Sequence, residues 1–210
     1  YIPSEMDLQQ RRIGMGSIDE VHFQLKGNPF VLVNAADLAH VKHKLKNTFQ
    51  HVFLAVIFVV AVNDYDCVQP DDRKTNCLTA SMDLFEDLCK SKSYQDTNII
   101  LFFNKRDLFK EKITRVPLRD YFPEYTGPNE PTAALSWIRT QFLLRRESGR
   151  RVYTHKTCAT NADNVEFTFQ AVQNAVLNMH LVDVGLMEDD RLTASDFWEK
   201  VDAAKFDEPE

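Results

Sequence analysis

Two continuous apolar runs constrain the fold of this chain more than any other feature of its sequence. Phe53 to Val62 and Ile99 to Phe103 contain no charged residue. Such runs are typical of parallel strands that are buried on both faces. The longer run has ten residues, whereas a membrane-spanning helix needs about 20. The runs therefore predict two buried strands of one parallel sheet and exclude a membrane span.

Helical patterns alternate with these strands. Apolar residues recur at spacings of three or four in residues 38–49, 78–88, 132–144 and 165–181. A third strand-like segment, Arg151 to His155, lies between the last two. This alternation predicts an α/β fold with a doubly wound, mostly parallel sheet, whose ligands lie at the carboxyl ends of the strands.

Near the beginning of the chain the pattern predicts a β-hairpin. Ile18 to Leu25 and Phe30 to Val33 flank the segment Lys26-Gly27-Asn28-Pro29. Glycine, asparagine and proline between two apolar runs are typical of a tight turn.

Composition excludes a general nucleic-acid binder. The net charge is −6 and the isoelectric point is near 5.5, whereas binding to phosphate backbones needs a basic face. The four cysteines lack metal-ligand spacing, so reduced thiols in a cytosolic setting are expected. Four histidines, His22, His51, His155 and His180, lack a carboxylate or cysteine at ligand spacing and are expected on the surface or paired in the core.

The strongest functional signal is a pair of short motifs, each directly after a predicted strand. Asn104-Lys105-Arg106-Asp107 follows the run that ends at Phe103, and Thr157-Cys158-Ala159-Thr160 follows the segment that ends at His155. The Asp107 carboxylate can accept hydrogen bonds from N1 and N2 of guanine, which adenine does not offer. Asn104 and Lys105 would brace the loop and cover the base. The backbone N–H of Ala159, flanked by Cys158 and Thr160, would face the guanine O6.

These motifs belong to a continuous resemblance to the α subunit of heterotrimeric G proteins, over residues 1–187. The stretches that carry the resemblance, besides the two motifs, are Tyr1-Ile2-Pro3, Asn63-Asp64-Tyr65-Asp66, Leu84-Phe85, Lys112-Ile113, Tyr121 to Tyr125, Tyr153-Thr154-His155, Asn164-Val165 and Val182 to Met187. The resemblance implies a Ras-like GTPase fold, guanine nucleotide (GTP or GDP) as ligand, and a receptor-coupled signalling role. It also favours a strand-end loop, rather than a metal site, for Asp64 and Asp66.

The residues that align with the family's switch regions are substituted. The resemblance places Arg12 at the position of the catalytic arginine, but Met15 replaces the threonine that binds Mg²⁺, and a thioether suits a hard cation poorly. In the second switch, Asn34 replaces an aspartate, Asp37 replaces a glycine, and Leu38 replaces the glutamine that orients water. Arg12 is therefore the single catalytic residue expected by resemblance. We expect weak Mg²⁺ binding, impaired hydrolysis and no protein metal site.

The phosphate-binding motif Gly-x-x-x-x-Gly-Lys-Ser/Thr does not occur in these 210 residues. In the family it lies upstream of the segment that matches Tyr1, together with the first strand and helix, so we expect a fragment or truncated product that lacks them. Residues 1–187 are expected to form a partial Ras-like domain, and the acidic extension 188–210 is expected to be disordered.

The resemblance also implies partners and a location. Residues 42–45 align with the helix that contacts the βγ dimer, although a solvated basic helix face explains them equally well. A G protein-coupled receptor or an exchange factor is the other expected partner. The expected location is the cytoplasm, or the inner face of the plasma membrane through partners or a lipidated segment. Two alternatives stay open, a working GTPase and a pseudo-GTPase that binds βγ or regulators without nucleotide.

Overall fold

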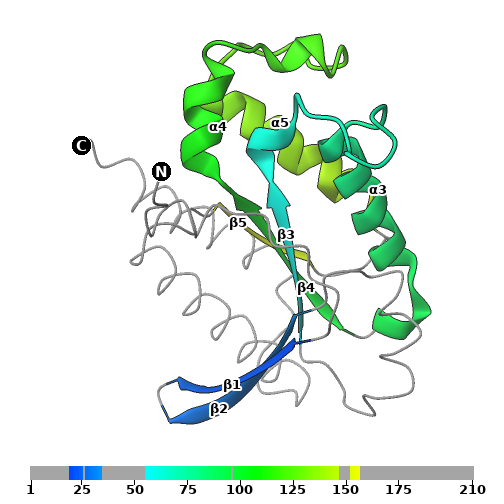
Figure 1. The fold of residues 1–210 in the computed structure, drawn as a ribbon, viewed down its shortest axis with the longest axis vertical. Coiled ribbons are helices and arrows are strands. Elements are labelled where there is room, and N and C mark those ends of the chain that lie inside the picture. The colour runs from blue at the N-terminus through cyan, green and yellow to red at the C-terminus, as the bar shows by residue number, and fades with distance from the viewer. Residues whose placement is uncertain (1–18, 26, 35–54, 96, 147–151, 157–210) are drawn as a thin grey trace, which may run out of the picture. The chain divides into compact units, whose positions relative to one another are not determined.

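The computed structural model describes residues 19–25, 27–34, 55–95, 97–146 and 152–156. They belong to two compact units, one on each side of the boundary between Val52 and Phe53. Within the described residues, the first unit contains a β-hairpin, and the second contains a three-stranded parallel sheet with its helices (Figure 1). The predicted helices at 38–49 and 165–181 and the extension 188–210 lie outside the described residues.

The predicted hairpin is confirmed, with a shorter turn than expected. Strand β1 (Asp19–Leu25) pairs antiparallel with β2 (Asn28–Asn34). Leu25 pairs with Asn28, so two residues separate the strands instead of the predicted four. Gly27 has φ of 82°, a value that glycine adopts without steric cost and that tight hairpin turns require.

The parallel sheet is confirmed as well. Strands β3 (Ala55–Ala61), β4 (Asn98–Asn104) and β5 (Val152–Lys156) pair side by side in the order β3-β4-β5, and all run in the same direction. All five residues of the run Ile99 to Phe103 are buried. This burial explains why β4 lacks the alternation of a half-buried strand.

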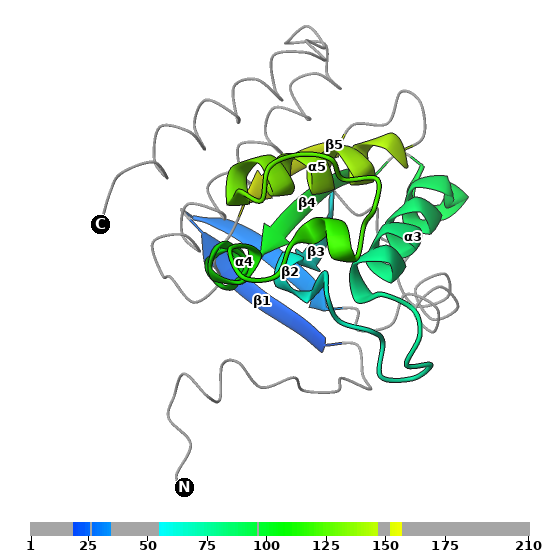
Figure 2. The ribbon, with the colours of Figure 1, turned by 90° about the horizontal axis from the view of Figure 1, so that it is seen from above.

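One face of this sheet is covered by helices α3 (Cys77–Lys90) and α5 (Pro131–Leu144), as Figures 1 and 2 show. Edge-to-face aromatic contacts join the layers. Ring centroids are 5.5 Å apart between Phe58 and Phe85, 5.5 Å between Phe85 and Phe142, and 5.6 Å between Phe142 and Phe103. Each such pair contributes about 0.5–1.5 kcal/mol beyond its buried area. The aromatic residues at helical spacing are therefore core residues.

The opposite face of the sheet is apolar too, but it is less completely buried. Ile100 and Phe102 form a buried cluster with the partly buried Ala55, Ile57 and Tyr153. Val59 keeps 56% of its surface exposed, so the expectation that the whole run Phe53 to Val62 is buried is wrong at this position. The reason is that β3 is an outer strand of the described sheet and Val59 points to the less covered face.

Sequence-encoded caps fix where the long helices begin. The Asn76 side chain accepts hydrogen bonds from the backbone N–H groups of Leu78 and Thr79, at 2.9 and 3.1 Å, and so caps α3. Pro131 is the first residue of α5, where its missing N–H costs nothing.

Four short helices complete the described fold, and none was predicted from the sequence. They are the α-helix α4 (Arg106–Ile113) and the 3-10 helices η1 (Val62–Asp64), η2 (Lys92–Tyr94) and η3 (Leu118–Asp120). Helix α4 begins inside the motif Asn104-Lys105-Arg106-Asp107, where the sequence predicts a loop.

Candidate functional site

The carboxyl ends of the three parallel strands lie along one edge of the sheet. Ala61, the last residue of β3, pairs with Asn104, the last residue of β4. On the other side of β4, Phe103 pairs with Lys156, the last residue of β5. Ligands in parallel α/β sheets bind at this kind of edge. The strand order therefore brings the first motif, and the start of the segment that leads into the second, to one place.

The first motif occupies the junction between β4 and α4. Asn104 ends the strand, Lys105 precedes the helix, and Asp107 is the second helical residue. Lys105 has φ of 60° and ψ of 37°, which is the left-handed conformation. For a residue with a Cβ this conformation costs about 1–3 kcal/mol, and such residues cluster at ligand sites and switches. Among the described residues, only Arg73 shares this property outside glycine.

The left-handed turn determines where the acidic side chain lies. The Lys105 carbonyl accepts the first backbone hydrogen bond of α4, from the Phe109 N–H at 3.0 Å. Asp107 therefore sits in the first turn of the helix, where the helix dipole favours a negative charge, and its side chain is exposed. An exposed carboxylate at the strand-end edge can accept two hydrogen bonds from a ligand.

A polar cluster, formed by Asn63, Tyr65, Asp66 and Lys112, joins the segment after β3 to α4. Lys112 Nζ donates to Asp66 Oδ1 at 2.7 Å and to the Asn63 carbonyl at 2.9 Å. The Tyr65 hydroxyl donates to the Val116 carbonyl at 2.6 Å. No local sequence pattern joins these residues, because 46 positions separate Asp66 from Lys112.

Burial sets the protonation of two groups in this region. The pKa of Tyr65 is raised above its ordinary value, first by burial and then by the Asp66 charge, so the phenol stays a hydrogen-bond donor. The pKa of the Cys67 thiol is also raised, first by burial and then by its hydrogen bond to Asp66. Cys67 Sγ lies 3.5 Å from Asp66 Oδ1. Neither group is prepared for nucleophilic chemistry.

His155, near the end of β5, is a core residue. It keeps 3% of its surface exposed, and its ring lies edge-to-face to Phe102 with centroids 5.7 Å apart. Burial lowers its pKa to about 4, so the imidazole is neutral near pH 7. His22, by contrast, is exposed on β1, with Nε2 at 3.5 Å from Glu20 Oε2. His22 is therefore a surface histidine and His155 a core histidine. The buried Nε2 of His155 makes no hydrogen bond within the described residues, so the pairing expected for a core histidine is not complete at this atom.

Several predicted site and switch residues lie outside the described residues. They are Arg12, Met15, Leu38, Cys158, Ala159 and Thr160. Asn34, the last residue of β2, is exposed and offers an amide where the family has a carboxylate. Within the described part of the chain, no three His, Cys, Asp or Glu residues are grouped so as to hold a metal ion. The same residues include no helix long and apolar enough to cross a membrane.

Comparison with known families agrees with this geometry. Residues 1–176 match the family described as the G-protein alpha subunit. The match includes the hairpin, the parallel sheet and both strand-end motifs. It confirms the resemblance over these residues, and membership of the family implies guanine nucleotide binding and a signalling role. The chain belongs to the G-protein α-subunit family.

Proposed function

We propose that this chain is a guanine-nucleotide-binding signal transducer that keeps base recognition and has impaired GTP hydrolysis. The observation that carries the proposal is the β4–α4 junction. There a left-handed Lys105 turns the chain so that Asp107 presents an exposed carboxylate at the carboxyl edge of the sheet.

Base recognition is assigned to the two motifs. Asp107 would accept from N1 and N2 of guanine, while Asn104 and Lys105 brace and cover the base. Cys158, Ala159 and Thr160 would complete the pocket, with the Ala159 N–H donating to O6. Parallel pairing supports this assignment, because the last described residue of β5, Lys156, lies beside Phe103 and directly precedes Thr157. A base without matching donors would leave a carboxylate unpaired, so discrimination is expected to be steep.

Impaired hydrolysis is inferred from the switch residues. Hydrolysis needs a cation to neutralise the phosphates and a group that orients water. Met15 and Asn34 fit poorly a Mg²⁺ site built from the family's threonine and aspartate, since Met15 supplies no oxygen and Asn34 supplies a neutral amide in place of a carboxylate. Leu38 has no polar atom with which to orient water. Arg12 remains as the proposed catalytic residue, but without those partners.

The proposed partners and location follow from family membership. We expect the chain to contact a βγ dimer through residues 42–45 and a receptor or exchange factor through the segment that ends at Met187. The proposed domain covers residues 1–187, with 188–210 as an acidic extension. A peripheral position at the inner face of the plasma membrane, reached through partners, agrees with these contacts.

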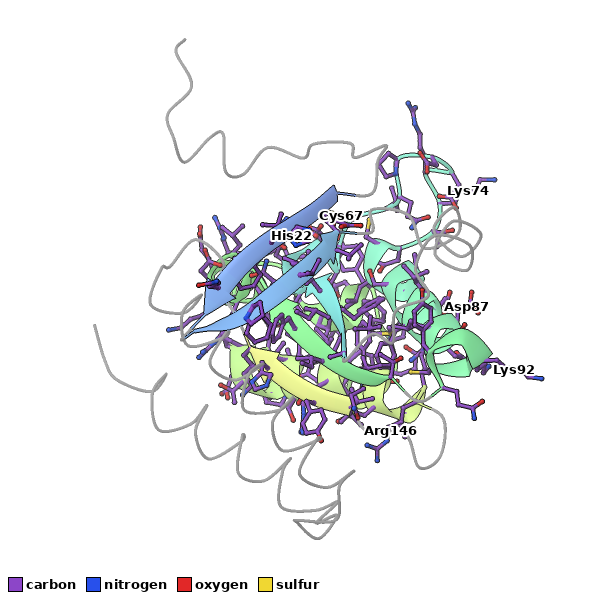
Figure 3. All side chains as sticks on the ribbon, turned by 90° about the horizontal axis from the view of Figure 1, so that it is seen from below. His22, Cys67, Lys74, Asp87, Lys92 and Arg146 are labelled. Atoms are coloured by element: carbon purple, nitrogen blue, oxygen red, sulfur yellow. The ribbon has the colours of Figure 1, made fainter. Side chains whose placement is uncertain are left out.

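A thermal shift experiment tests nucleotide binding directly. A ligand that binds only the native state increases the free energy of unfolding, by about 2.7 kcal/mol at a concentration 100 times Kd. The melting temperature rises as a result. GDP should therefore stabilise the chain, and ATP should not. Asp107→Ala should remove the shift, while Asp87→Ala, which changes an exposed carboxylate on the outer side of α3 (Figure 3), should keep it.

The substituted switches favour a second candidate function, a pseudo-GTPase module that binds βγ or regulators without nucleotide. The same experiment separates the two candidates. If millimolar GDP leaves the melting temperature unchanged, base recognition is absent and the second function is favoured.

A further inference from the structure

The polar cluster formed by Asn63, Tyr65, Asp66 and Lys112 contacts the middle and the carboxyl end of α4, whose first turn carries Asp107. We propose that Lys112, held by Asp66, is a positioning residue that orients the α4 turn carrying Asp107 and so sets the selectivity for guanine. This inference rests on the proposed function, because it assigns a role within the same site.

Helix α4 depends on outside contacts for its orientation. It has eight residues, and isolated helices shorter than about 12–15 residues are marginal in water. No side chain caps its amino end, and only Phe109 and Ile113 are buried along its length. The exposed Asp107 therefore has no side-chain anchor of its own in the first turn. Its position follows from the left-handed turn at Lys105 and from whatever holds the rest of the helix.

The segment Asn63 to Asp66 supplies this hold at three successive points. The Tyr65 ring packs edge-to-face on Phe109, with centroids 5.6 Å apart. Lys112 reaches back to Asp66 and Asn63, and its ammonium lies 5.8 Å from the centre of the Tyr65 ring. Beyond the helix, Tyr65 is hydrogen-bonded to Val116. One short segment thus fixes the middle, the end and the exit of α4.

Lys112 is the charged member of this hold and is partly shielded from water. The Lys112 and Asp66 side chains keep 28% and 19% of their surface exposed. Exposed ion pairs contribute little, but a shielded lysine with a carboxylate and a carbonyl acceptor has a defined geometry. The ion pair between Arg115 and Glu111, by contrast, is not shielded from water. These two side chains keep 69% and 68% of their surface exposed.

The anchoring segment also belongs to the strand-end edge itself. Helix η1 directly follows Ala61, which pairs with Asn104. Asn76 Nδ2 donates to the Tyr65 carbonyl at 2.6 Å while the other end of its amide caps α3. The segment that orients α4 is therefore fixed to both the sheet and α3. A change at Lys112 is expected to alter the angle of α4 relative to the sheet and α3.

The test compares GDP with inosine diphosphate, which lacks the 2-amino group that Asp107 would bind. In the unmodified 210-residue chain, GDP should bind about 10- to 100-fold more tightly, because one hydrogen bond to a charged acceptor is lost with inosine. Lys112→Met should reduce this ratio by about fivefold. Lys112→Arg, which keeps a donor for Asp66, should restore the ratio to within about twofold.

Lys110→Met is the matched control, since it removes an exposed lysine from the same helix and should leave the ratio unchanged. Asp66→Asn provides a second route if Lys112→Met fails to fold, because it keeps the shape and an acceptor oxygen but loses the charge. It should also lower the ratio.

The outcomes are distinct. A purely structural role would weaken GDP and inosine diphosphate equally, so an unchanged ratio in Lys112→Met, or in Asp66→Asn if that variant is the one that folds, overturns the inference. If the unmodified chain binds neither nucleotide, the proposed function fails and the positioning role falls with it. A changed ratio in Lys112→Met with an unchanged ratio in Lys110→Met supports it.

Discussion

The two halves of the proposed function, base recognition and phosphate chemistry, differ in what their side chains can do. The β4–α4 junction keeps a carboxylate, Asp107, at a turn whose left-handed residue and helix start are defined by the fold. The switch positions Met15, Asn34 and Leu38 carry a thioether, a neutral amide and an alkyl group where the family has a hydroxyl, a carboxylate and a water-orienting amide. We therefore expect base recognition and hydrolysis to be separable in this chain, because the residues proposed for them differ.

The largest expected difference between the halves concerns hydrolysis. With saturating GTP in a single-turnover assay, we expect the chain to be slower than an α subunit with intact switches by at least about 10²–10³-fold, as expected from the loss of one transition-state contact. The measurement is release of labelled phosphate. A rate equal to that of an intact family member would remove the distinction between the two halves.

Acid should weaken the fold around β5, the strand that carries His155. The pKa of His155 is lowered from 6.5 to about 4 in the folded chain. The unfolded chain therefore binds more protons between these values, so the stability from His155 is present above pH 6.5 and is lost as pH falls toward 4. The full loss is about 3 kcal/mol, of which about 1.4 kcal/mol is lost by pH 5.5.

Denaturant unfolding at pH 7.5 and 5.5 measures this loss. His155→Gln should reduce the pH dependence, while the matched variant His22→Gln, which changes an exposed histidine, should leave it unchanged. Equal pH dependence in the chain and in His155→Gln would mean that His155 is not the titrating group.

The smallest expected effect is that of metal removal. Because we expect the substituted switch residues to bind Mg²⁺ weakly, chelation with EDTA should change the GDP dissociation constant by less than about twofold. Titration calorimetry with and without EDTA measures it. A large loss of affinity in EDTA would show that the phosphate half binds the metal through other residues.

Local patterns predicted most of the described fold. Strand β4 follows from the run Ile99 to Phe103 because burial on both faces leaves a continuous apolar signature. Helix α5 follows from the apolar residues that recur at spacings of three or four in residues 132–144. These elements are visible in the sequence because each contributes a full face to the core.

Helix α4 and its anchors could not be predicted in this way. Only Phe109 and Ile113 of its residues are buried, which is too few to give a periodic signal. Its position depends on Tyr65 and Lys112, which are far apart in sequence, and on a left-handed Lys105 that no local propensity requires. Consequently the sequence predicted that Asp107 follows a strand, but not what orients it.

The most direct test of the central claim exchanges the base specificity. Xanthine has a carbonyl oxygen where guanine has the 2-amino group, so an amide at position 107 can donate to xanthine but no longer matches guanine. Asp107→Asn should lower the affinity for GDP by about 10- to 100-fold and raise the affinity for xanthosine diphosphate. Titration calorimetry with both nucleotides measures the exchange. Unchanged affinity for GDP, or equal loss of both nucleotides, would contradict recognition of the base by Asp107.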